Sequence, residues 1–233
     1  MARTRTGAEL VDDSYKRADM QGATDRFPRT EVLRYVNQGA AALYDLLIKA
    51  RGKPYYAVKP APVLTTTAST SRYALSATTP AVSNFYQLSA VRLSGPGGYM
   101  LEPFTPQDEP WLREPGASGA KPTHYELQPG YIELLPLHSA SLSVVIDYVP
   151  AFTDLADSSN TFDGINGWEE YVYSSAACEM LTKDDELPLK NSILGDMAKL
   201  EARIAQLAPR RDNYRAERAK NVRGNNAWPW RGR

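Results

Sequence analysis

The residue types best suited to chemistry in this chain are aromatic and cationic, and they gather in the stretch from Arg210 to Arg233. Trp228 and Trp230 stand there on either side of Pro229. Each indole carries about 150–250 Å² of surface that favours burial, and proline fixes φ and favours an extended residue before it. The chemistry indicated is binding: the segment is typical of an anchor peptide buried in another molecule. A disordered end with chance aromatic residues is the alternative.

Charge is unevenly distributed along the chain, although the net charge of the whole sequence is zero. From 209 to 233 there are eight bases and two acids, whereas from 154 to 187 there are nine acids and one base. Such segregation favours head-to-tail contact between copies, or contact of the basic tail with an acidic partner or nucleic acid. Two solvated faces of a monomer would give the same pattern. The tail side chains expected to bind a partner are Arg215, Arg218, Arg223, Trp228, Pro229, Trp230, Arg231 and Arg233.

The sequence contains no motif that is typical of a catalytic, nucleotide-binding or metal-binding site. The glycine-rich run 94–98 lacks the Lys-Ser/Thr pair that grips phosphate. His124 and His138 have neither a nearby cysteine nor an acid at ligand spacing. Cys178 lies in an apolar helical stretch and is expected to be a core residue. We therefore predict no enzyme, no catalytic residue, no metal and no cofactor. A hydrolase would need carboxylates or the two histidines to converge in a pocket.

Helical periodicity marks both ends of the chain. Thr6 and Glu9 have capping-box spacing for a helix over about 7–20, and Thr30 is a credible cap for a second helix over 31–50. The second helix carries one apolar face, formed by Val32, Val36, Ala40, Leu43 and Leu47. A third helix is expected over 168–182 and a fourth after Pro188. The fourth carries an apolar seam that we assign to the core of the same chain: Ile193, Met197, Leu200, Ile204 and Leu207.

The middle of the chain, from 55 to 149, is rich in β-branched and aromatic residues in short runs. Gln128-Pro129-Gly130 predicts a hairpin turn, since proline sets one dihedral angle and glycine permits a positive φ. The proline-rich stretch 104–122 is expected to be irregular; its Trp111 either is an exposed anchor for the tail side or a neighbour, or pins the stretch to the sheet. The predicted strands are 55–58, 72–76, 86–93, 99–102, 124–127, 131–135 and 142–149.

The fold class expected is α+β: a bundle of about four helices with an inserted antiparallel β module and an extended C-terminal tail. We place the N-terminal helices in residues 1–54, the β module in 55–150, the C-terminal helices in 151–209 and the basic docking tail in 210–233. The N-terminus lacks the apolar stretch of a signal peptide, and no run approaches the roughly 20 apolar residues of a membrane span. The protein is expected to be soluble and made in the cytosol, with no membrane partner.

Four phrases of the sequence, together with the order of its segments, resemble the head-to-tail adaptor proteins of tailed bacteriophages. The phrases are Gly98-Tyr99-Met100-Leu101-Glu102-Pro103-Phe104, Gly130-Tyr131-Ile132-Glu133-Leu134-Leu135-Pro136, Ile146-Asp147-Tyr148-Val149-Pro150 and Gly167-Trp168-Glu169-Glu170-Tyr171-Val172. The resemblance covers roughly residues 30 to 212 and is one of pattern and phrase.

The resemblance implies a structural virion protein at the head–tail interface. Such adaptors form a ring, usually of twelve copies, beneath the portal of the DNA-filled head, and tail or nozzle proteins bind below it. By resemblance, the segment from Arg210 to Arg233 docks on the portal, with Trp228 and Trp230 as anchors, and basic side chains in the channel contact packaged DNA without sequence preference. An aromatic β module that binds a glycan or another surface ligand is the alternative function.

Overall fold

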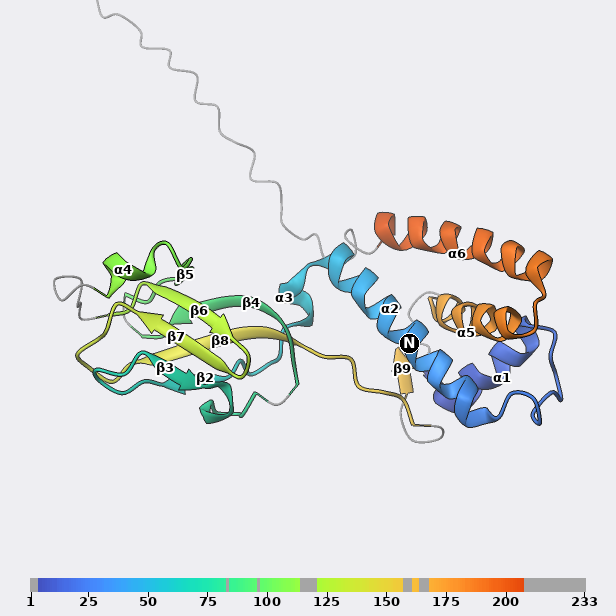
Figure 1. The fold of residues 1–233 in the computed structure, drawn as a ribbon, viewed down its shortest axis with the longest axis horizontal. Helices are drawn as coiled ribbons and strands as arrows, with labels where there is room; N and C mark the ends of the chain where they lie inside the picture. The colour runs from blue at the N-terminus through green and yellow to red at the C-terminus, as the bar shows by residue number, and fades with distance from the viewer. Residues whose placement is uncertain are drawn as a thin grey trace, which may run out of the picture.

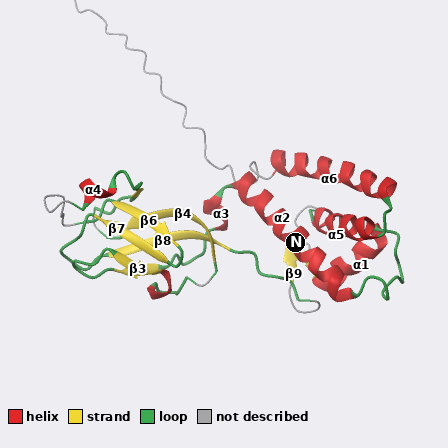
Figure 2. Ribbon diagram, viewed as in Figure 1, coloured by secondary structure: helices red, strands yellow, loops and turns green. Residues whose placement is uncertain are grey.

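The computed structural model describes residues 4–82, 84–95, 97–113, 121–156, 161–163 and 168–207. The elements gather in two lobes, one of helices and one of strands, joined by α2 and α3 on one side and by the chain leaving β8 on the other (Figures 1 and 2). The expected mixed α+β class, with sheets that are mainly antiparallel, is confirmed. The extended tail predicted for 210–233 lies outside the described residues.

Four helices from the two ends of the described chain form the helical lobe. They are α1 (Gly7–Arg17), α2 (Arg29–Arg51), α5 (Glu169–Lys183) and α6 (Leu187–Leu207). α2 and α5 make the most extensive helix–helix contact, and α6 packs on both of them (Figure 1). The apolar face predicted for the second helix is buried: Val36 and Leu43 are inaccessible to solvent, as is Met180 of α5. One core therefore unites segments more than 100 residues apart.

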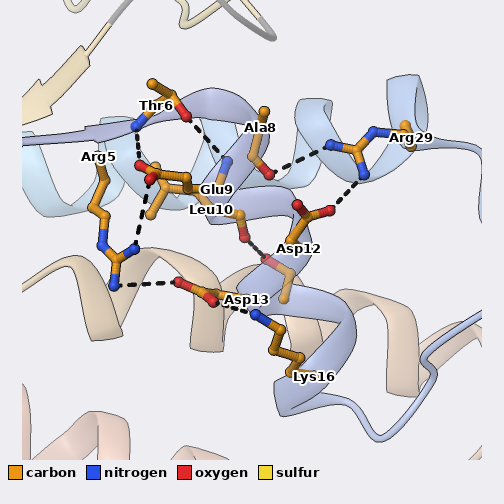
Figure 3. Close-up of polar contacts among 10 residues, drawn as sticks. Arg5, Thr6, Ala8, Glu9, Leu10, Asp12, Asp13, Lys16 and Arg29 are labelled. Carbon is orange, nitrogen blue, oxygen red and sulfur yellow. Dashed lines mark hydrogen bonds and ion pairs between the residues drawn. The ribbon is translucent and has the colours of Figure 1, made fainter.

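The first helix begins with the capping box that its sequence predicts. Thr6 Oγ1 accepts a hydrogen bond from the Glu9 backbone N–H at 3.2 Å, and the Thr6 N–H donates to Glu9 Oε2 at 2.9 Å (Figure 3). Two of the N–H groups that lack intrahelical partners are thereby satisfied. Farther along α1, Asp12 accepts from Arg29 at the start of α2, which ties the two helices together (Figure 3).

Replacing Thr6 by alanine is expected to lower the free energy of unfolding by about 1 kcal/mol, because the Glu9 N–H loses its acceptor. Urea denaturation followed by circular dichroism measures the effect. Thr6→Ser retains the hydroxyl and serves as the matched control, which should recover most of the loss. Equal stability of Thr6→Ala and the unchanged protein would contradict the capping role.

The second helix begins differently from the prediction. Its N-cap is Pro28, and Thr30, predicted as the cap, lies within the first turn. The Pro28 carbonyl accepts from the N–H groups of Glu31 and Val32, at 2.9 and 3.1 Å. Proline sets φ near the helical value, so the helix starts directly after it and no hydroxyl cap is used. The helix ends at Arg51, and Gly52 adopts φ +87° as the chain leaves it.

The apolar seam of the last helix lies in the helical core, as predicted, except at its end. Ile193, Met197, Leu200 and Ile204 are buried in the cluster that α1, α2 and α5 share. Leu207, the fifth seam position, is 43 % exposed. It lies at the C-terminal end of α6, beyond the last buried seam residue.

The β lobe contains two sheets packed face to face. One has the order β2 (Val63–Thr65), β8 (Ser143–Pro150), β4 (Phe85–Leu93), and the other β3 (Arg72–Ala74), β7 (Tyr131–Leu135), β6 (His124–Gln128), β5 (Glu102–Pro103). All neighbours are antiparallel except β5 and β6. Ile132 and Leu134 of one sheet meet Val144 and Ile146 of the other in a buried core. A further pair, β1 (Thr4–Thr6) and β9 (Thr161–Asp163), lies beside the helices.

Four predictions in the β region are wrong in detail. Of residues 55–58, predicted as a strand, Tyr55 and Tyr56 lie in a single helical turn, α3 (Lys53–Tyr56), which Pro54 permits in its first turn, and Ala57 and Val58 lie in no strand. Of 99–102, only Glu102 belongs to a strand, and Met100 makes an isolated bridge to Arg92. The run 72–76 is shorter than predicted, because a 3₁₀ turn over Leu75–Ala77 follows β3. The stretch expected to be irregular also holds a short helix, α4 (Glu109–Leu112).

The turn chemistry of the sequence is confirmed. β6 and β7 pair as a hairpin whose closing residues are Gln128 and Tyr131, and Gly130 in the turn has φ +77°. A residue with a Cβ atom would be strained in that conformation. The backbone after β4 likewise turns through Gly95 and Gly97, both with positive φ. A hydrogen bond from the Leu93 N–H to the Tyr99 carbonyl, at 2.9 Å, joins the two sides of this turn.

Candidate interaction surfaces

The two lobes meet through an aromatic contact between α2 and the ends of β4 and β8. The Tyr44 hydroxyl donates to the Pro150 carbonyl at 3.0 Å, and the Tyr86 hydroxyl donates to Asp45 at 2.6 Å. The Tyr44 ring lies 5.5 Å from the ring of Tyr56 and 6.5 Å from that of Tyr86. Rigid rings and directed hydrogen bonds therefore set the position of the β lobe against the helices.

The sequence left two alternatives for Trp111 in the proline-rich stretch, an exposed anchor or a residue that pins the stretch to the sheet. The structure shows features of both. Trp111 lies on α4 and is 49 % exposed. Its ring also meets the edge or face of the His124 ring at a centroid distance of 5.7 Å, with the two planes nearly perpendicular. The helix itself is held to the sheet below by Leu112, which is buried with Phe104 and Leu135. Trp111 is thus fixed to its own sheet and still presents half of its surface.

Beside Trp111 lies the solvent side of the β3-β7-β6-β5 sheet. Side chains alternate along a strand, so Tyr131 and Glu133, on either side of the core position Ile132, point away from the core. A direct cross-strand row of Arg72, Glu133 and Glu126 results from the pairing of β3, β7 and β6. We name this surface the outer sheet face and define it by Arg72, Glu102, Trp111, Arg113, His124, Glu126, Gln128, Tyr131 and Glu133.

Ion pairs order the middle of the outer sheet face. Arg113, the C-cap of α4, contacts Glu109 Oε1 at 2.7 Å and Glu133 Oε1 at 2.5 Å. Both carboxylates hold the pKa of the Arg113 guanidinium above its usual range. Glu133 and Glu126 face one another across the strands, and like charges in that arrangement repel. The guanidinium of Arg113 offsets this repulsion at Glu133 and fixes its own side chain over the sheet.

At the far end of the same face, an arginine already stacks on an aromatic ring. The Arg72 guanidinium lies 4.4 Å from the centroid of the Tyr131 ring, and Tyr131 is 42 % exposed. A cation over a ring face is attracted by the negative π cloud. Tryptophan, tyrosine and arginine are the residue types enriched at energetic centres of protein interfaces. The outer sheet face therefore has the composition of a docking surface.

A second charged region lies between α1 and the start of α5. A cavity of about 460 Å³ is bordered there by three bases and three acids, and by one tyrosine. Asp13 contacts Arg5 at 3.8 Å and Lys16 at 3.2 Å, and Arg17 reaches Asp196 of α6 at 2.8 Å (Figure 3 shows the Arg5, Asp13 and Lys16 contacts). The charges are largely compensated within the cavity, which ties α1 to its neighbours. Its lining residues are Arg5, Asp13, Lys16, Arg17, Glu169, Glu170 and Tyr173.

Part of the acidic run recognised in the sequence is used inside the helical lobe. Asp184 pairs with Arg26, and Lys183 lies 2.9 Å from Glu31 Oε1. Glu169, at the start of α5, is buried. Glu179, Asp185 and Glu186 remain exposed. The acids that could meet a basic partner on this lobe are thus fewer than the sequence count indicates.

The two histidines occupy different settings. His124 lies on the outer sheet face, whereas His138 is only 2 % exposed. The Tyr73 hydroxyl lies 3.3 Å from His138 Nε2 and donates to the Thr70 carbonyl at 2.7 Å. Burial lowers the pKa of His138, although a hydrogen bond with the Thr67 backbone acts in the opposite direction. The side chain therefore helps to close the loops at this end of the β lobe in its neutral form.

Acidification is expected to weaken the β lobe through His138. Its pKa is lower in the folded chain than in the unfolded chain, so the unfolded state binds more protons as the pH falls below about 6.5, the usual histidine value. The free energy of unfolding should decrease from pH 7 to pH 5. Denaturant titrations at these values would measure it, and His138→Gln should flatten the dependence. An unchanged slope in that variant would contradict the assignment.

The structure can be compared with the sequence predictions for the cysteine, for metal ligands, for membrane spans and for the tail. Cys178 is buried in the helical core, as predicted, and burial raises the pKa of its thiol. Among the described residues, no three histidine, cysteine or acidic side chains gather as metal ligands would. No helix in the described part of the chain has the length and apolar content needed to cross a membrane. The tail residues Arg215, Arg218, Arg223, Trp228, Pro229, Trp230, Arg231 and Arg233 lie outside the described residues.

Sequence reasoning missed most of the outer sheet face. It selected Trp111 but not Arg72, Arg113, Glu126 or Tyr131, because their proximity depends on the pairing of strands far apart in the chain. A signal existed in the alternation of side chains around the 128–130 turn, which sends Glu126 and Tyr131 away from the core.

A scan against protein-family models finds no match to this chain, and a search of curated proteins finds no match either.

Proposed function

We propose that this protein is a non-enzymatic head-to-tail connector of a tailed bacteriophage, a ring-forming adaptor beneath the portal. In this proposal the fold is a helical bundle with an inserted β module and an extended C-terminal tail. The tail, residues 210–233, docks on the portal protein, and tail or nozzle proteins bind elsewhere on the ring. The protein is made in the bacterial cytoplasm and resides in the virion at the head–tail interface.

The observation that carries the proposal is the pairing of a closed helical core with an indole-tipped basic tail. Leu10, Val36 and Leu43 of the core are already inaccessible to solvent within the described residues. That core requires no indole from the tail. Burying Trp228 and Trp230 favours association by roughly 4–6 kcal/mol per ring as an upper bound from area alone. A second molecule is the natural place for that burial.

A ring of identical copies requires two unlike surfaces that meet, since each copy contacts its neighbour head to tail. Unequal charge supports this arrangement: the tail is basic, and exposed acids such as Glu179, Asp185 and Glu186 occur on the helical lobe. Twelve copies would follow from the family resemblance. DNA passing through such a ring would meet basic side chains through its phosphates, independently of sequence.

The proposal is tested by mixing the purified protein with purified portal rings and imaging the mixture by negative-stain electron microscopy. We expect a second ring seated coaxially on the portal. The portal alone and the protein alone are the controls. Portal rings that remain bare when the connector is in large excess would contradict the proposed function.

A β ligand-binding module is a second candidate, favoured by the exposed rings of Trp111, Tyr131 and Tyr86 on the β lobe. Sugars can stack on such rings and form hydrogen bonds with neighbouring carboxylates and amides. Titration with glycans from the host surface, followed by tryptophan fluorescence, distinguishes the two functions. A saturable response lost in Trp111→Ala would favour the ligand-binding module, whereas a connector gives no saturable response.

A further inference from the structure

The outer sheet face has two carboxylates for which the described residues supply no cation. Glu102 is exposed on β5 and is in register with His124 of β6. Glu126 accepts a hydrogen bond from the Gln128 amide at 2.9 Å, but no lysine or arginine of the described chain pairs with it. Arg113 is already shared by Glu109 and Glu133, and the Arg72 guanidinium lies over the Tyr131 ring. Additional positive charge from outside would be favourable here.

The same face offers aromatic rings next to those carboxylates. Trp111 packs against the His124 ring at one end of the outer sheet face. Tyr131 lies at the other end, where the guanidinium of Arg72 already stacks on its ring. Aromatic rings combined with carboxylates suit guanidinium groups, which stack on a ring and donate in-plane hydrogen bonds at once. The contact with the His124 ring holds Trp111, and the hydrogen bond from Gln128 holds Glu126, before a partner arrives. Less conformational entropy is therefore lost on binding.

One segment of this chain has the matching chemistry. Residues 210–223 contain six bases and two acids, and the bases are spread along the segment rather than clustered at one end. They precede the two indoles, so contact of this part with one molecule leaves Trp228 and Trp230 available for another. A fully extended stretch of 14 residues spans up to about 50 Å. It could therefore cross from its own subunit to the next one.

We propose that the arginine-rich segment 210–223 of one copy docks on the outer sheet face of a neighbouring copy. Its arginines pair with Glu102 and Glu126 and stack beside Trp111. This inference rests on the proposed connector ring and assigns its head-to-tail contact between copies. The arginines of residues 210–223 then bind the neighbour, and the portal contact of the proposed function falls to residues 224–233, which include the two indoles.

A peptide titration tests the surface. A fluorescein-labelled peptide of residues 210–223 is titrated with the full chain carrying Arg215→Glu and Arg218→Glu, so that the chain's own segment does not compete. Fluorescence anisotropy should show saturable binding that weakens as salt rises, since exposed charges are screened. Adding Trp111→Ala or Glu126→Gln should weaken binding roughly ten-fold. Glu179→Gln, at an exposed carboxylate of α5, is the matched control and should have no effect.

The result that overturns the surface assignment is either no binding or binding equally strong in the Trp111→Ala and Glu126→Gln variants. Circular dichroism of each variant establishes that it is folded. The portal is absent from this titration, so failure here leaves the proposed function standing. Loss of the proposed function, in turn, would appear as failure to bind portal rings and would leave the peptide result intact.

A cross-link distinguishes a neighbouring copy from the same copy. One preparation carries Glu126→Cys and another Arg218→Cys; the native Cys178 is buried. After the two are mixed on portal rings and oxidised, a disulfide between unlike copies is expected on a non-reducing gel. If a chain that carries both substitutions instead closes the disulfide within itself and stays a monomer, the segment docks in its own subunit and the inference is wrong.

Discussion

Replacing Trp228 and Trp230 together by alanine should reduce binding to the portal ring by at least 100-fold, with no loss of folded protein. Tryptophans at the centre of an interface commonly contribute about 2–4 kcal/mol each when truncated, and 1.4 kcal/mol corresponds to a factor of ten in Kd. The helical and β core clusters are buried among described residues, so the free energy of unfolding should not change. Co-sedimentation with portal rings over a range of protein concentrations measures the affinity.

Met100→Ala is the matched control for this experiment, because it also removes a large exposed apolar side chain but from the β lobe. It should retain direct portal binding. Deletion of residues 225–233 should reproduce the double substitution, since the deletion removes both anchors. Portal binding at full strength in either tail variant would reject the docking role of the tail.

Truncation of the helical core should have the largest effect on stability. Leu43→Ala removes a side chain that is inaccessible to solvent between α2 and α5. The loss of buried apolar surface and the cavity left behind should lower the free energy of unfolding by about 2–5 kcal/mol. Urea denaturation followed at 222 nm measures this change, and the variant is expected to unfold at a much lower urea concentration.

The same substitution at Leu194 provides the control. Leu194 lies on α6 and is 43 % exposed, in contrast to its buried neighbour Ile193. Leu194→Ala should change the free energy of unfolding by less than about 1 kcal/mol. Similar losses in the two variants would mean that the helical lobe is not organised around the α2–α5 contact.

The parts of the fold that the sequence predicted well are those set by local physics. Val36 and Leu43 share one helical face because of the 3.6-residue period, and that face is buried. Thr6 and Glu9 predicted a capping box through side chains three residues apart. The hairpin around Gly130 followed from a residue that tolerates positive φ. In each case the determining contacts lie within a few residues.

The parts that were missed depend on distant partners. β2 has three residues and is stabilised as a strand by β8, which lies about 80 residues later in the chain. β1 pairs with β9 across an even longer separation. The helical turn at 53–56 resembled a strand in composition, because tyrosine is enriched in strands, whereas Pro54 in the first turn permits the helical conformation that the chain adopts. Trp111 was found by its residue type, but Arg72, Glu126 and Tyr131 required the strand order.

The central claim is that the terminal indoles are sheltered by the portal. A cryo-electron microscopy map of the connector bound to its portal tests it most directly, with a map of the Trp228→Ala, Trp230→Ala variant mixed with portal as the control. The account predicts density for both indoles in apolar pockets of the portal, continuous with a chain leading back to the connector. Indoles packed against their own subunit, or a tail without ordered density in an otherwise well-resolved complex, would contradict it.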